Sequence, residues 1–89
     1  MKKAEYYTEI TKRSIPYFYK MMNLIEQGII KAAENGYTKY EVSIKTLLDV
    51  LRISVDEDKY SSLRNLIIKE IKSKDFTYGF DNGQLIIYW

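Results

Sequence analysis

Apolar side chains recur every three or four positions over residues 18–33, and polar side chains fill the positions between them. This period predicts an amphipathic helix. Pro16 suits the first turn of a helix, where its missing N–H costs nothing, so we expect the helix to start near residue 16. Ser14 or Ile15 would then be the capping residue. Gly36 should end the helix, because glycine readily takes the left-handed conformation that follows helix C-termini.

The period changes after residue 38. Apolar and polar residues alternate over 39–43, which predicts a short strand with one face in water. From residue 44 the apolar positions return to helical spacing, so we expect a helix over 44–52, with Ser43 as its cap.

A third helix is expected to begin near residues 57–59. Three acidic residues, 56–58, precede it, and the positive end of the helix dipole favours negative charge there. Helical spacing predicts its buried positions, which are Leu63, Leu66, Ile67 and Ile71, with Tyr60 and Ile68 at the margins.

The last fourteen residues predict a β-hairpin. Asn82-Gly83 is the favoured pair for a two-residue turn with positive φ at both positions. This turn pairs Asp81 with Gln84, which determines the register of the whole hairpin. Six large side chains then share one face, which we expect in the core: Phe76, Tyr78, Phe80, Leu85, Ile87 and Trp89. The opposite face holds Thr77, Gly79, Ile86 and Tyr88.

The sequence therefore predicts one α+β domain over residues 16–89, with three helices, a short strand and a C-terminal hairpin. Residues 1–15 carry four basic side chains and a short amphipathic pattern around Ile10, so we expect a basic arm or a short helix there.

Composition narrows the possible chemistry. The chain has 89 residues, no cysteine and no histidine, which excludes disulfides, thiolate metal sites and the commonest general base. We expect no enzymatic activity, no cofactor, no metal and no small-molecule substrate. No apolar run is long enough to span a membrane and the basic N-terminus has no apolar signal region, so an intracellular, cytoplasmic protein is expected.

The stretch SIKTLLDVLRISVDEDKYSSLRNLIIKEIK, followed by the hairpin, resembles the winged-helix variant of the helix-turn-helix. This resemblance covers about residues 16–89 and implies duplex DNA binding, with the third helix in the major groove and the hairpin as the wing. On this resemblance the groove-facing residues would be Lys59, Ser62, Asn65, Lys69 and Lys72, and the wing tip would be 81–83. It also implies dimerisation, through residues 2–30. A fainter resemblance is to small phage-encoded proteins of Gram-positive hosts, which end in a glycine turn, an aliphatic strand and a tryptophan.

Local charge bears on the same function. Residues 59–74 hold five basic side chains, including Arg64, and one acidic side chain, which gives +4 in a protein of net charge +2. Such a surface could follow DNA phosphates, or it could simply be the solvated face of a helix. The acidic residues 56–58 and Asp81 stand where phosphates would approach and would repel them.

The remaining aromatic and apolar side chains indicate an alternative function. Six of them exceed what one small core needs and are candidates for protein contact: Tyr6, Tyr7, Tyr17, Tyr19, Ile86 and Tyr88. We therefore keep two hypotheses, which are a dimeric DNA-binding regulator and a phage or mobile-element protein that binds and inhibits a host or defence protein.

Overall fold

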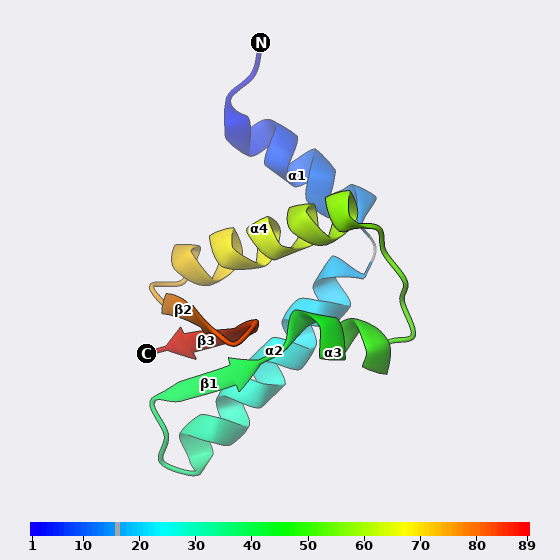
Figure 1. Cartoon of the computed structure of the whole chain (residues 1–89). Coiled ribbons are helices and arrows are strands. Elements are labelled where there is room, and N and C mark those ends of the chain that lie inside the picture. The colour runs from blue at the N-terminus through cyan, green and yellow to red at the C-terminus, as the bar shows by residue number, and fades with distance from the viewer. Residues whose placement is uncertain (16) are drawn as a thin grey trace.

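Four helices and a three-stranded antiparallel sheet make up the computed structural model, which describes residues 1–15 and 17–89 (Figure 1). The elements, in chain order, are α1 (Ala4–Ser14), α2 (Phe18–Glu34), β1 (Lys39–Val42), α3 (Ile44–Val50), α4 (Glu57–Ser73), β2 (Thr77–Asp81) and β3 (Gln84–Tyr88). This is the predicted α+β class with a winged-helix-like layout.

The sheet has the strand order β1-β3-β2, so the last strand of the chain lies in the centre. Asp81 pairs with Gln84 and Tyr78 with Ile87, which confirms the predicted hairpin register. Asn82 and Gly83 both have positive φ, at 50° and 77°, as the two-residue turn requires.

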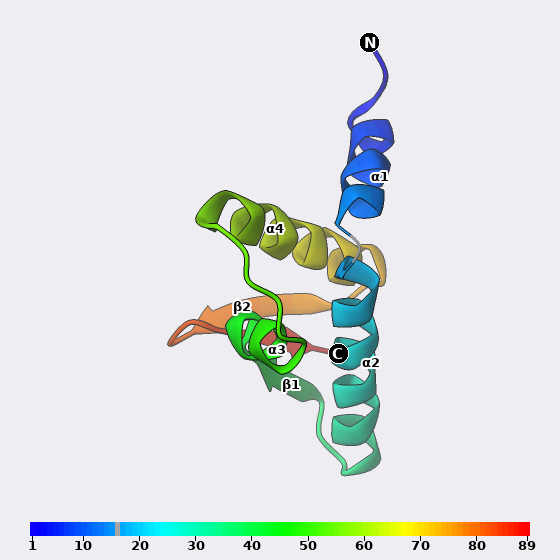
Figure 2. The same cartoon turned by 90° about the vertical axis from the view of Figure 1, so that its right-hand side faces the viewer.

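The core lies between the sheet and the helices α2, α3 and α4 (Figure 2). Its most deeply buried side chains come from three elements of the chain: Phe18, Met21 and Ile25 from α2, Leu63 and Ile67 from α4, and Leu85 and Ile87 from β3. The predicted apolar stripes of α2 and α4 therefore face each other and the central strand.

Helices α3 and α4 begin as expected. The Ser43 hydroxyl accepts a hydrogen bond from the Thr46 N–H at 3.2 Å, and the Asp56 carboxylate accepts one from the Lys59 N–H at 2.8 Å. Arg52, in the turn between the two helices, has φ 57° and takes the left-handed conformation that usually favours glycine. Arg52 therefore has a backbone conformation in this turn that non-glycine residues seldom adopt.

The start of α2 differs from the prediction. This helix begins at Phe18, and Tyr17 is its N-cap residue without a side-chain cap. Ser14 instead ends α1 and donates its hydroxyl hydrogen bond to the Ile10 carbonyl at 2.9 Å, while Ile15 is the C-cap of α1. Neither residue caps α2, because the preceding segment forms a helix of its own. The prediction for Pro16 lies outside the described residues.

Helix α1 extends away from the rest of the molecule (Figures 1 and 2). None of its residues is buried. The predicted short N-terminal helix is thus present, and it is held to the domain only near its C-terminal end. None of the described helices is both long and apolar enough to cross a membrane.

The predicted core face of the hairpin is only half buried. Leu85 and Ile87 are in the core and Phe76 packs partly against it, but Tyr78, Phe80 and Trp89 are exposed. Tyr78 and Phe80 are exposed because β2 lies at the edge of the sheet, whereas β3 lies in its centre. Trp89 is exposed because it lies just beyond the end of β3. The prediction that all six side chains are buried was wrong.

Candidate nucleic-acid interface

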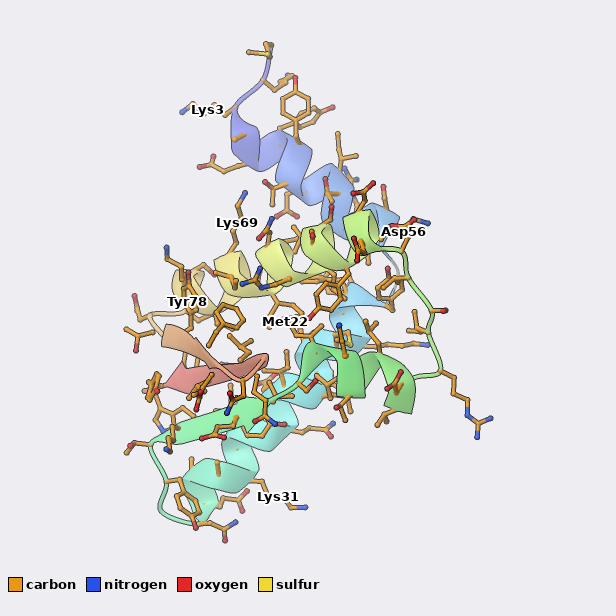
Figure 3. The ribbon with its side chains drawn as sticks, in the orientation of Figure 1. Lys3, Met22, Lys31, Asp56, Lys69 and Tyr78 are labelled. Atoms are coloured by element: carbon orange, nitrogen blue, oxygen red, sulfur yellow. The ribbon has the colours of Figure 1, made fainter. Side chains whose placement is uncertain are left out.

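The exposed face of α4 carries four of the residues predicted to contact DNA. Ser62, Asn65, Lys69 and Lys72 follow one another at spacings of three and four, which brings them to one side of the helix, and all four are exposed. In Figure 3, Lys69 points away from the sheet and into solvent. This face is polar and open over about three turns.

The other two predicted residues lie at the edges of this face. Lys59 is exposed in the first turn, where its N–H is held by the Asp56 carboxylate. Arg64 turns toward the hairpin, and its guanidinium carbon lies 4.3 Å from the centre of the Phe80 ring. The structure therefore links Arg64 to the wing instead of aligning it with Asn65 and Lys69.

The single acidic residue of segment 59–74 is neutralised by α1. Glu70 accepts a hydrogen bond from the Lys12 ammonium at 2.9 Å, and the Lys12 side chain is only 15% exposed. This hydrogen bond with Glu70 is the main cause that raises the pKa of Lys12 above its ordinary value. None of the five basic residues of the segment forms an ion pair within the described chain. Its positive charge is thus fully available.

Charge is unevenly distributed along α4. Asp56, Glu57 and Asp58 lie at its N-terminal end, whereas Lys69, Lys72 and Lys74 lie at or just beyond its C-terminal turns. Figure 2 shows the N-terminal end of α4 and the β2–β3 turn projecting to the same side of the molecule, so Asp81 lies on the acidic side. Phosphates are therefore favoured at the C-terminal half of α4 and disfavoured at the wing tip.

Sequence reasoning missed two aromatic residues beside this face. Tyr78 and Phe80 were assigned to the core, but they are 38% and 41% exposed and form an edge-to-face pair with ring centres 5.8 Å apart. The signal available in the sequence was that β2 also contains Gly79 and Asp81 and has fewer aliphatic residues than β3. An edge strand tolerates such a composition better than a central one.

Only some of the six candidate protein-contact residues are exposed in the structure. Tyr6, Tyr7, Tyr19 and Tyr88 are exposed, as that hypothesis requires. Ile86 is only 8% exposed, because the central strand places it between β1 and β2, opposite Glu41 and Gly79. Ile86 is therefore not available to a partner.

Tyr17 is also poorly accessible to a partner protein. It is half-buried and packs against the core, and its hydroxyl is buried without a hydrogen-bond partner among the described residues. Burial, and secondarily the negative charge of Asp56, raise the pKa of Tyr17 above its ordinary value.

Helix α1 presents its apolar residues to solvent. Thr8, Lys12 and Ile15 lie on the half-buried or buried side of this segment, whereas Tyr6, Tyr7 and Ile10 are exposed. The two tyrosine rings are packed edge to face at 5.3 Å. The amphipathic pattern of this helix is thus not used to attach it to its own domain.

An open cavity of about 510 Å³ lies between α3 and the start of α4, lined by polar and apolar side chains that include Lys45, Asp49 and Tyr60. Among the described residues no group of three or more acidic side chains is arranged to hold a metal ion.

Comparisons of this chain with protein-family models, curated proteins and solved structures found no match.

Proposed function

We propose that this protein is a non-enzymatic DNA-binding protein that contacts duplex DNA through the exposed face of α4. The observation that supports this most is the polar face of Ser62, Asn65, Lys69 and Lys72 in a segment whose only acidic residue is paired with Lys12. Lysines of this kind neutralise phosphates, while an asparagine on the same face can form hydrogen bonds with the edge of an adenine.

The acidic N-terminal end of α4 determines how the duplex would lie. Each close contact between a carboxylate and a phosphate costs about 1 kcal/mol in water. The duplex would therefore be held by the C-terminal half of α4, with Lys69 and Lys72 on the phosphates. The wing tip at Asp81 would point away from the backbone.

Binding to a random duplex across a salt series tests this proposal. We expect weak binding whose affinity falls as the salt concentration rises. In a plot of log affinity against log salt concentration, the slope should become shallower by about 0.9 for each phosphate contact removed. Lys69→Glu and Lys72→Glu should each abolish most of the binding. Lys31→Glu is the matched control, because Lys31 is exposed near the C-terminal end of α2, far from Lys69 (Figure 3). Absence of binding by the wild type at low salt would contradict the proposal.

A second function, binding to a protein, is favoured by one specific observation. The apolar residues of α1 face solvent on a helix that extends from the domain, and such exposed stripes are typical of protein contacts. The partner would be a protein target or a second copy of the chain bound through residues 2–30.

Sedimentation distinguishes these two partners. A concentration-dependent dimer that dissociates in a Tyr6→Ser, Ile10→Ser variant would support a second copy. A monomer at every concentration would exclude the homodimer and leave a different protein as the partner of α1.

A further inference from the structure

We infer that Tyr78 and Phe80, together with Arg64, form a stacking site for unpaired bases beside the DNA-binding face of α4. This inference rests on the proposed function and specifies it further. The favoured DNA would be a duplex with an adjoining single-stranded segment, and the bases of that segment would lie against the wing.

The first support is the amount of aromatic surface left in solvent. Tyr78 and Phe80 pack against each other, and Phe80 packs against Arg64, yet the two rings remain 38% and 41% exposed. Figure 3 shows Tyr78 in the space between the hairpin and α4. Two neighbouring aromatic rings at the edge of a sheet can accept the flat face of any base, because every base has a π surface.

The second support is the stack that already exists within the site. The Arg64 guanidinium lies over the Phe80 ring at 4.3 Å, and Arg64 is exposed. A guanidinium plane held in this way can itself carry a base, as arginine planes do in proteins that bind single-stranded nucleic acid. The side chain does not need to be ordered on binding, since Phe80 already positions it.

The third support is the geometry of β2 relative to α4. The strand follows the helix through a short turn at Asp75 and runs back along it, so Phe80 lies near Arg64. Two strand residues advance about 6.6 Å and four helical residues about 6 Å. Tyr78 is therefore level with Ile68, and Lys72 lies one helical turn beyond.

Charge in this region favours a nucleic acid over an acidic protein or a neutral peptide. Arg64 lies over Phe80 on the helix side of the site, and Lys69 and Lys72 are exposed farther along α4. The nearby acidic residues are Asp81 at the wing tip and Asp75 at the α4–β2 turn, one at each end of the strand. A single strand can therefore cross the middle of β2 with its phosphates close to the basic residues and its bases on the rings.

The test compares three DNAs of the same duplex sequence: a blunt duplex, one with a short thymine overhang, and one with an abasic overhang of the same length. The abasic overhang keeps the phosphates and removes the bases. We expect the thymine overhang to bind more tightly than the other two by about fivefold or more, which corresponds to one stacked base.

Two variants of Tyr78 distinguish the loss of base stacking from a loss of folding. Tyr78→Leu retains apolar cover and should lose the preference for the thymine overhang, whereas Tyr78→Phe should retain it. Tyr37→Leu is the control, because Tyr37 is an exposed tyrosine in the α2–β1 loop, remote from α4 (Figure 1). Circular dichroism of each variant verifies that the fold is intact.

The possible outcomes separate this inference from the proposed function. Equal binding to the thymine and abasic overhangs would overturn the stacking site and leave duplex binding intact. Binding that requires the overhang bases, with no affinity for the blunt duplex, would support the stacking site and overturn duplex binding. No binding to any of the three DNAs would overturn both.

Discussion

The two strands of the hairpin have the same length but differ in composition and in environment. In β3, the three consecutive residues 85–87 are all buried, whereas no residue of β2 is buried. Both strands come from one local turn, and both have their apolar residues in the predicted register. The difference shows that a shared register does not make two strands equally buried, because the central strand β3 is mainly aliphatic and the edge strand β2 carries two aromatic residues beside Gly79 and Asp81.

Strand β1 can be compared with β2, because it also lies at an edge of the sheet. Its Tyr40 is half-buried and packs against the core, unlike Tyr78 on β2. Tyr40 is covered by α2, where Gly28 leaves room for its ring. On the two edge strands, α2 therefore covers Tyr40 more completely than α4 covers Tyr78.

The largest expected effect is the contrast between Ile87→Ala and Tyr78→Ala. Ile87 is 0% exposed, so its truncation should lower the free energy of unfolding by about 3 to 4 kcal/mol through lost burial and a cavity. Tyr78→Ala should lower it by about 1 kcal/mol or less, because much of the ring is already in water. Urea unfolding measures both, and equal losses would contradict the comparison.

Gly28→Ala should be the next largest effect. Alanine favours helices more than glycine does. At this position, however, its Cβ would overlap the ring atoms of Tyr40. We expect a net loss of about 1 to 3 kcal/mol from overpacking. Tyr40→Leu in the same chain should recover part of this loss, and a stabilising Gly28→Ala would show that Tyr40 does not pack here.

Tyr17→Phe should have a smaller effect of opposite sign. The Tyr17 hydroxyl is buried without a partner among the described residues, so its removal should stabilise the fold by about 1 kcal/mol. Because the pKa of Tyr17 is raised in the folded state, the wild type should lose stability as pH rises above about 10. The folded chain there binds more protons than the unfolded chain. Unfolding at neutral and alkaline pH should show a weaker loss in the variant, and an unchanged alkaline loss would contradict the assignment.

The smallest expected effect is the coupling between Arg64 and Phe80. A double-mutant cycle of Arg64→Ala and Phe80→Ala should give about 0.5 to 1 kcal/mol, the range for an exposed cation–π contact. Additive losses would show that the two side chains do not interact in solution.

Most of the fold could be predicted because its signals are local. The period of apolar residues gave the positions of α2, β1, α3 and α4, and Ser43 and Asp56 cap their helices through contacts three residues away. The start of α2 could not be predicted in the same way. Ser14 and Ile15 belong to α1, and a residue that suits a helix cap also suits the last turn of a preceding helix.

The candidate site could be predicted only in part. The exposed positions of Ser62, Asn65 and Lys69 follow from helical spacing alone once the buried stripe of α4 is known. Alternation did not identify Tyr78 and Phe80, because it tells which residues share a face but not how far the core extends under that face. Only the composition of β2, with Gly79 and Asp81, pointed to an edge strand.

By itself, then, the sequence determined the order of the elements, the hairpin register and the local charge of α4. These depend on residues a few positions apart, through turn conformation, capping and periodicity. Only the tertiary structure decided that Lys12 neutralises Glu70, 58 residues away, that Arg64 stacks on Phe80, and that Ile86 is buried while Tyr78 is exposed. The physical reason is that burial and charge pairing depend on which distant elements lie side by side, and no local pattern encodes that arrangement.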